Sequence, residues 1–82
     1  MPGPYQTERQ ALDDVRDIYD AARASRERAT MQRLSAERIV DACIEAGVRL
    51  GRYDVATIDW LAGFEPQQAQ VFAELIRRAT TS

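Results

Sequence analysis

The stretch DVATIDWLAGFEPQQAQVFAELIRRA, residues 54–79, decides the fold, because a helix end and a helix start follow one another within it. It also contains the only Trp and both Phe residues of the chain. Gly63 predicts the end of one helix, in the left-handed conformation that glycine adopts without steric cost. Pro66 predicts the start of another, where its missing N–H is not needed. We therefore expect two helices, over 54–62 and 66–79, paired like a helix-turn-helix.

Apolar residues recur at helical spacing in both predicted helices. Asp54 is expected to cap the first, because a short carboxylate accepts bonds from the free N–H groups of a helix start. The repeated positions are Val55, Ile58, Leu61 and Ala62 in the first helix and Ala69, Phe72, Ile76 and Ala79 in the second. Trp60 and Phe64 flank the turn, and the pattern leaves open whether they fill the core or form an interface.

A third helix is predicted upstream, over 35–50. Ser35 has the side chain of an N-cap, and Gly51 is a plausible stop, with Gly47 inside the helix at a cost of about 1 kcal/mol relative to Ala. Cys43 lies on the apolar face of this helix and is the only cysteine, so we expect a buried small hydrophobe and no internal disulfide.

The N-terminal part predicts a long helix over 7–28, with Thr7 as its cap. Its apolar stripe consists of Ala11, Leu12, Val15, Ile18, Tyr19 and Ala22. Residues 25–34 are mostly polar, and the sequence leaves open whether they are helix or linker. Residues 1–6 contain two prolines and a glycine and are expected to be flexible. The whole chain, 1–82, is thus predicted to be one small all-α domain of four helices.

Composition narrows the possible roles. The 82 residues are 45% hydrophobic and 29% charged, with a formal net charge of −2. No apolar run is long enough for a membrane span, and the N-terminus MPGP has no signal-peptide pattern. These features favour a soluble cytoplasmic protein without membrane association. The low net charge also predicts no broad attraction to nucleic acid.

The residue types present argue against metal binding and catalysis. The chain has no His and one Cys, so zinc lacks its usual ligands, and the acidic cluster around Asp17 has helical rather than calcium-loop spacing. There is no Ser–His or Cys–His pair and no glycine-rich phosphate loop. The sequence therefore predicts no metal, no cofactor, no small-molecule substrate and no enzymatic activity.

A protein–protein interaction, including self-association, is the role that the sequence favours. Residues 8–20 carry a net charge of −3 and residues 23–38 a net charge of +3, so two antiparallel copies would bring opposite charges together. We expect a homodimer held mainly by the N-terminal helix, with the aromatic residues at the turn as further anchors. The candidate interface consists of Leu12, Val15, Ile18, Tyr19, Trp60 and Phe64.

An alternative is a small DNA-binding regulator that uses residues 54–79. Residues 37–47, ERIVDACIEAG, together with 53–58, YDVATI, resemble the opening helices of tetracycline-repressor-type regulators. That resemblance implies a helix-turn-helix fold and DNA binding. The likeness ends at Gly63-Phe64-Glu65-Pro66, and the helix after it has no cation before Arg77. The candidate nucleic-acid contacts of this alternative are Arg33, Arg38, Gln67 and Gln70.

A second resemblance covers the C-terminal part. The run WLAGFEP, residues 60–66, followed by a helix ending IRRA at 76–79, resembles a segment of short uncharacterised helical proteins from actinobacteria and their phages. All eleven cations of the chain are Arg, which agrees with such a GC-rich source. The resemblance implies no particular activity.

Overall fold

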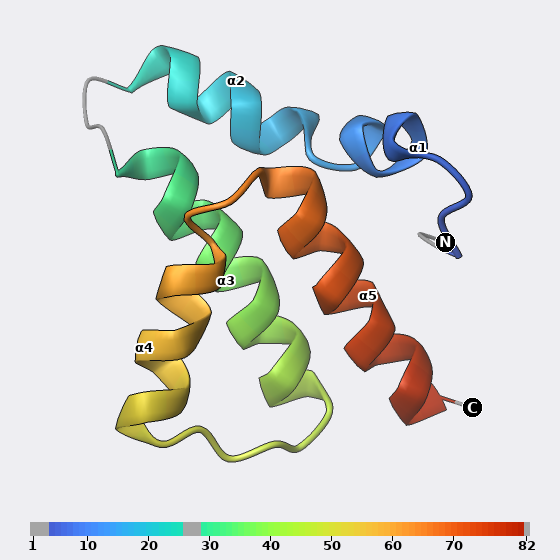
Figure 1. Ribbon diagram of the computed structural model, residues 1–82, viewed down its shortest axis with the longest axis vertical. Coiled ribbons are helices and arrows are strands. Elements are labelled where there is room, and N and C mark those ends of the chain that lie inside the picture. The colour runs from blue at the N-terminus through green and yellow to red at the C-terminus, as the bar shows by residue number, and fades with distance from the viewer. Residues whose placement is uncertain (1–3, 26–28, 82) are drawn as a thin grey trace.

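Helix α3 lies at the centre of the molecule. The computed structural model describes residues 4–25 and 29–81, with helices α1 (Glu8–Asp13), α2 (Arg16–Ala24), α3 (Thr30–Glu45), α4 (Arg52–Leu61) and α5 (Pro66–Thr81). Helices α2, α4 and α5 pack on α3, and α1 packs on α5. Figure 1 shows α4 and α5 on either side of α3, with α1 and α2 crossing the end at which α3 and α5 begin. No strand occurs within these ranges, so the predicted all-α class is confirmed.

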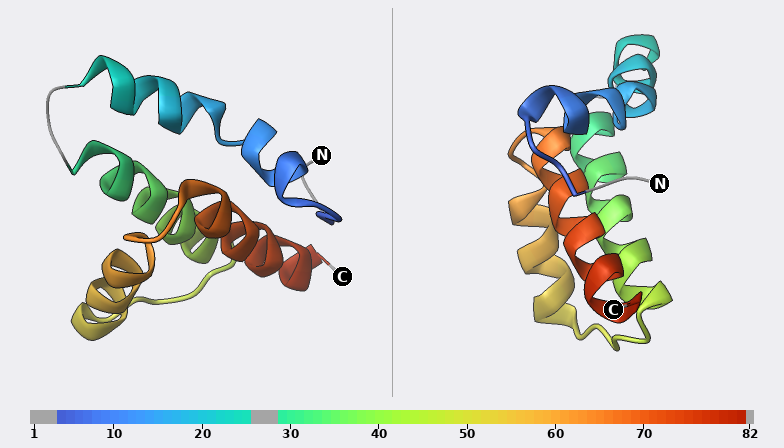
Figure 2. Two further views of the ribbon diagram at one scale, coloured as in Figure 1. Left: turned by 45° about the horizontal axis from the view of Figure 1, so that its top comes forward. Right: turned by 90° about the vertical axis from the view of Figure 1, so that its right-hand side faces the viewer.

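The molecule is thin. Its principal extents are 38 × 32 × 16 Å, and the right-hand view of Figure 2 shows the narrow side. The shortest extent is roughly one and a half times the diameter of one helix with its side chains. A slab of this kind buries less of each helix than a closed bundle does, so a large part of α4 and α5 faces solvent.

The long N-terminal helix of the sequence prediction is broken in two. Thr7 caps α1 as predicted, in a capping box with Gln10. In a continuous helix Ile18 N–H would donate to the Asp14 carbonyl, but it donates to the Val15 carbonyl at 3.0 Å. The Asp14 carbonyl instead accepts from Arg38 Nη1 at 3.1 Å. This contact with α3 replaces the missing helical bond. The predicted end of the helix, residues 26–28, lies outside the described residues.

Helix α3 begins five residues before the predicted start. Thr30 to Leu34 are helical, which settles that part of the 25–34 segment. Ser35 is not an N-cap: it is buried within the helix, and its hydroxyl donates to the Met31 carbonyl at 2.8 Å. This bond gives the Ser35 hydroxyl a partner inside the helix, so the residue does not have to lie at a helix N-terminus.

Helix α3 also ends earlier than predicted, at Glu45. Gly47 adopts a φ of +78° and is not inside the helix. Val48 N–H donates to the Cys43 carbonyl at 2.9 Å and Gly47 N–H donates to the Ile44 carbonyl at 3.0 Å. This pair of bonds is a Schellman motif, which requires a left-handed residue at the position of Gly47.

The predicted caps around α4 are shifted. Gly51 is the N-cap rather than a helix stop, and Asp54 lies one turn inside, where its Oδ2 accepts from Gly51 N–H at 2.8 Å. Gly63 does not have a positive φ; the turn is closed by Gly63 N–H to the Trp60 carbonyl at 3.1 Å. Pro66 begins α5 as predicted.

The hydrophobic core lies between α3, α4 and α5 and is built from small side chains. It consists of Ala36, Ile39, Cys43, Ile58, Ala62 and Ala69, with Val40, Leu50 and Ile76 packed against it. The predicted burial of Cys43 is confirmed. Alanine at several of these positions lets the helices approach closely. Larger apolar side chains, such as Phe72 and Leu75, lie outside this core and are exposed to solvent.

Candidate interaction surface

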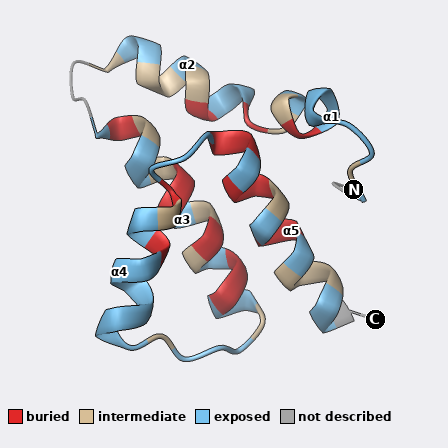
Figure 3. Ribbon diagram, viewed as in Figure 1, coloured by how far each residue is buried: buried red, intermediate tan, exposed pale blue. Residues whose placement is uncertain are grey.

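Helix α5 buries polar side chains and exposes large apolar ones. Gln67, Gln70 and Glu74 are 3%, 2% and 4% exposed, whereas Phe72 and Leu75 are 47% and 50% exposed. The apolar face of a helix in a globular protein normally points toward the core. Figure 3 shows buried and exposed residues alternating along α5.

These residues define two faces of α5. The polar face, Gln67, Gln70 and Glu74, is buried in the protein. The outer stripe, Gln68, Phe72, Leu75 and Ala79, is exposed to solvent at successive steps of four, three and four residues. Residues at this spacing lie along one side of a helix.

Gln67 connects α5 to the N-terminal helices. Its Oε1 accepts a hydrogen bond from the Tyr19 hydroxyl at 2.7 Å, and its Nε2 donates to Glu8 Oε2 at 2.9 Å and to the Glu65 carboxylate. Burial raises the pKa of Tyr19, and the carboxylates of Glu65 and Glu8 act in the same direction. Both the oxygen and the nitrogen of the Gln67 amide thus have hydrogen-bond partners within the protein, and the role of this side chain is structural.

Gln70 makes the second polar connection. Its Oε1 accepts from Arg38 Nη1 at 2.8 Å, and its Nε2 donates to the Tyr5 hydroxyl at 3.1 Å. The Tyr5 hydroxyl in turn donates to Asp14 Oδ2 at 2.6 Å. Burial and the hydrogen bond to Asp14 raise the pKa of Tyr5 to about 12. Tyr5 thus docks the segment before α1 on α5, although residues 1–6 were expected to be flexible; residues 1–3 lie outside the described range.

Glu74 completes the polar face through Arg77. Arg77 Nη1 donates to Glu74 Oε2 at 2.6 Å, and Arg77 Nε donates to Glu45 Oε2 on α3 at 2.7 Å. These two bonds raise the pKa of Arg77. In the described part of the chain, no buried side-chain nitrogen or oxygen lacks a hydrogen-bond partner. The polar face therefore holds the fold together and offers no unsatisfied group to a ligand.

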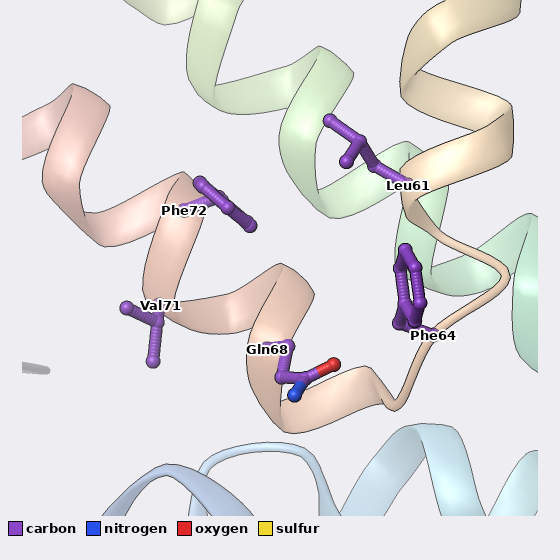
Figure 4. Close-up of a pocket in the computed structure, with 5 residues that line it drawn as sticks. All are labelled: Leu61, Phe64, Gln68, Val71 and Phe72. Atoms are coloured by element: carbon purple, nitrogen blue, oxygen red, sulfur yellow. The ribbon is translucent and has the colours of Figure 1, made fainter.

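The opposite side of α5 borders an apolar groove. We call it the α4–α5 groove; it has a volume of about 460 Å³ and is lined by Leu61, Phe64, Gln68, Val71 and Phe72. Figure 4 shows Gln68 and Phe72 extending from α5 toward the side on which Leu61 and Phe64 lie. Such a wide apolar cleft with one amide group is suited to a side chain or a helix rather than to a polar substrate.

Trp60 extends the apolar surface beyond the groove. Its ring meets the Phe64 ring edge to face, with centroids 5.3 Å apart and an interplanar angle of 87°. Trp60 is 67% exposed, so the question that the sequence left open is answered: both aromatic rings lie at the surface. Tryptophan in such positions is a frequent anchor of protein interfaces.

The predicted interface on the N-terminal helix needs correction. Val15 and Ile18 are 0% and 1% exposed, because the break after α1 turns them into the protein. Leu12 and Tyr19 are half-buried and line a shallow cavity of about 310 Å³ among Arg–Asp pairs such as Arg16–Asp13. The charge blocks also pair within the chain, through Arg38 and Asp17. Of the predicted interface residues, Trp60 and Phe64 are the exposed ones.

The residues of the nucleic-acid alternative are not brought together at the surface. Gln67 and Gln70 are buried in the polar face, and Arg38 is engaged with Asp17, Gln70 and the Asp14 carbonyl. Arg33 is exposed and lies 3.7 Å from Glu37. A recognition helix needs its side chains free to reach base edges, and the side chains of Gln67 and Gln70 are buried.

The sequence reasoning missed Val71, Leu75 and the exposed position of Phe72. The apolar repeat placed Phe72 on one stripe with Ala69, Ile76 and Ala79, whereas the structure buries Ala69 and exposes Phe72. The informative signal was the placement of Gln67, Gln70 and Glu74 on one side of the same helix, which requires partners from other segments.

The other surfaces of the molecule are less suited to binding a partner. A cavity of about 410 Å³ between α3 and α4 is lined by charged and small residues, including Arg33 and Asp59. Within the described ranges, no group of three or more acidic or Cys side chains is placed to hold a metal ion, and no helix has the length and apolarity to cross a membrane. Comparisons with protein-family models, curated proteins and solved structures found no match.

Proposed function

We propose that this chain is a non-enzymatic protein-interaction module that binds through the α4–α5 groove and the outer stripe of α5. The observation that carries the proposal is the inverted burial of α5, which keeps three polar side chains inside and presents Phe72 and Leu75 to solvent. Burial of these apolar side chains against a partner is favourable by roughly 25 cal/mol per Å², and this gain offsets the entropic cost of association.

The chemistry of the surface identifies the class of partner. The α4–α5 groove is open and apolar, and two aromatic rings, Trp60 and Phe64, stand at its edge. Contiguous apolar surface of this kind marks a site for another protein rather than for a phosphate or sugar. An apolar groove between two helices most readily accepts the apolar side of a third helix.

A partner-independent selection tests this proposal. A displayed library of helical peptides is panned against the wild-type protein and counter-selected against the Phe72→Asp/Leu75→Asp variant. We expect amphipathic helices that bind the wild type and not this variant. The control is Ile44→Asp/Val48→Asp, which places the same charges at apolar positions that are 62% and 47% exposed and do not line the groove.

The result that would overturn the proposal is equally specific. Selected peptides that bind the wild type and the Phe72→Asp/Leu75→Asp variant equally well would place the binding surface elsewhere. A selection that yields no helical binder, at a protein concentration at which the chain is monomeric, would contradict the proposed groove mode. Circular dichroism of both variants checks that they keep the wild-type helix content.

A further inference from the structure

Building on the proposed function, we propose that the partner of the outer stripe is the α5 helix of a second copy of this chain. The two helices pair antiparallel about a two-fold axis that passes between Phe72 and Leu75. Each copy thereby covers the α4–α5 groove of the other. The result is a symmetric dimer in which α5 is central and α4 is peripheral.

The spacing of the outer stripe is the first argument. The steps 68 to 72, 72 to 75 and 75 to 79 are four, three and four residues, so the spacing of the stripe is the same in both directions along the helix. Reversal about its centre places Phe72 against the partner's Leu75 and Gln68 against the partner's Ala79. Each large apolar side chain meets another, and each end pairs a longer side chain with a small one, so the side chains of the two helices can interdigitate.

The stripe also lacks the charges that would oppose self-pairing. Its four residues are uncharged, so two copies bring no like charges together at the centre. Antiparallel helices set their dipoles in opposite directions. Glu65, the residue before α5, then lies at the same end as the basic last turn of the partner helix, which contains the partner's Arg78.

Surface area gives the third argument. The chain exposes 5863 Å². A compact monomer of 9.3 kDa is expected to expose roughly 5,000 Å². The surplus, about 900 Å², is close to the roughly 800 Å² that each partner contributes to a stable interface. The exposed apolar side chains of α4 and α5 account for where such an interface would form.

The oligomeric state tests the pairing. Sedimentation equilibrium and light scattering of the wild type at micromolar to millimolar concentration are expected to show a monomer–dimer equilibrium. Phe72→Asp/Leu75→Asp introduces four charges at the centre of the dimer and is expected to raise the dissociation constant on the order of 100-fold or more. Ile44→Asp/Val48→Asp is expected to dimerise like the wild type.

Cysteine cross-linking tests the direction and register of the helices. In a Cys43→Ala background, Gln68→Cys/Ala79→Cys is expected to oxidise to a closed covalent dimer held by two disulfides. Gln68→Cys alone and Ala79→Cys alone are expected to remain monomeric on a denaturing gel. Within one helix the two sites are roughly 16 Å apart, so an internal disulfide does not form.

The outcomes separate this inference from the proposed function. A wild-type monomer at millimolar concentration overturns the dimer, and the peptide selection still decides whether the groove binds another protein. Cross-linking of either single-cysteine variant indicates a parallel pair and overturns the antiparallel register. Dimerisation of Phe72→Asp/Leu75→Asp at wild-type strength shows that the interface lies on another face.

Discussion

Tyr19 and Gln67 are 48 positions apart in sequence and meet in a hydrogen bond, with the Tyr19 hydroxyl donating to Gln67 Oε1 at 2.7 Å. Because this bond joins α2 to the first turn of α5, it fixes which side of α5 is buried. A polar residue occupies an interior position, and the apolar residues on the other side of the helix are left in solvent. The exposed apolar surface of α5 is therefore a consequence of the polar contacts on the opposite, buried side of this helix.

Tyr19→Phe is expected to lower the free energy of unfolding by about 1–2 kcal/mol, because the buried amide oxygen of Gln67 loses its hydrogen-bond donor. Chemical denaturation monitored by circular dichroism measures this change. Tyr53→Phe is the matched control: Tyr53 is 84% exposed, and the change there is expected to stay within about 0.5 kcal/mol. Equal effects at both positions would mean that the Tyr19–Gln67 bond does not contribute to stability.

Arg38→Ala is expected to destabilise the protein by about 2–3 kcal/mol, because it removes the donor from the buried Gln70 oxygen and from the Asp14 carbonyl. Arg33→Ala, at an exposed arginine on the same helix, is expected to cost less than about 1 kcal/mol. Thermal and urea unfolding of the two variants give the comparison. If Arg33→Ala lowered the free energy of unfolding more than Arg38→Ala, the interior role assigned to Arg38 would be wrong.

Tyr5 predicts a stability change at high pH. Its pKa is raised from 10.0 to about 12 by burial and by the hydrogen bond to Asp14, with smaller contributions from the Asp14 and Glu74 charges, whereas its bond to Gln70 acts in the opposite direction. A raised pKa favours the neutral phenol in the folded state. This contribution is fully present below pH 10, the ordinary pKa, and is lost as the pH rises toward 12.

Unfolding titrations between neutral and alkaline pH check this expectation. Tyr5→Phe is expected to be less stable than the wild type at neutral pH and to lose less stability as the pH rises through this window. Tyr19 keeps part of the slope in both proteins, because its pKa is raised as well. An unchanged slope in Tyr5→Phe would show that this hydroxyl is not held neutral by the fold.

Gly47→Ala is expected to destabilise the protein by about 1 kcal/mol, because the φ of +78° at the end of α3 is strained for any residue with a Cβ. The space itself is open, since a Cβ at this position meets no atom within 4 Å. Gly47→Asn is the control, because asparagine adopts the left-handed conformation at a smaller cost than other residues with a Cβ. We expect its stability to lie between those of the wild type and Gly47→Ala. Thermal denaturation separates the two, and an equally stable Gly47→Ala would argue against the Schellman motif.

Local signals predicted the rough position of most helices, but not the division of the first one into α1 and α2. Thr7, Pro66 and the buried Cys43 are where the sequence placed them, because caps, helix starts and apolar faces depend on near neighbours in the chain. The break after α1 was not predictable in this way. It depends on Arg38, which is 24 residues away from the Asp14 carbonyl that it binds.

The candidate surface was less accessible to sequence reasoning. Helix α5 has apolar residues on both sides, with Ala69 and Ala73 on one and Phe72 and Leu75 on the other. Size and hydrophobicity favour the second pair for the core, yet the structure buries the alanines. The choice depends on long-range hydrogen bonds from Tyr5, Tyr19 and Arg38, which no local pattern reveals.

The central place of α3 has a consequence for how the molecule opens. Helices α2, α4 and α5 each pack on α3, so any one of them can detach while the others keep their contacts with it. Loss of α3 itself removes the common support of all three. Amide hydrogen exchange is therefore expected to be slowest in the middle of α3, at a rate set by global unfolding. Exchange in α4, in which Ile58 is the one buried residue, is expected to proceed by local opening and to be faster.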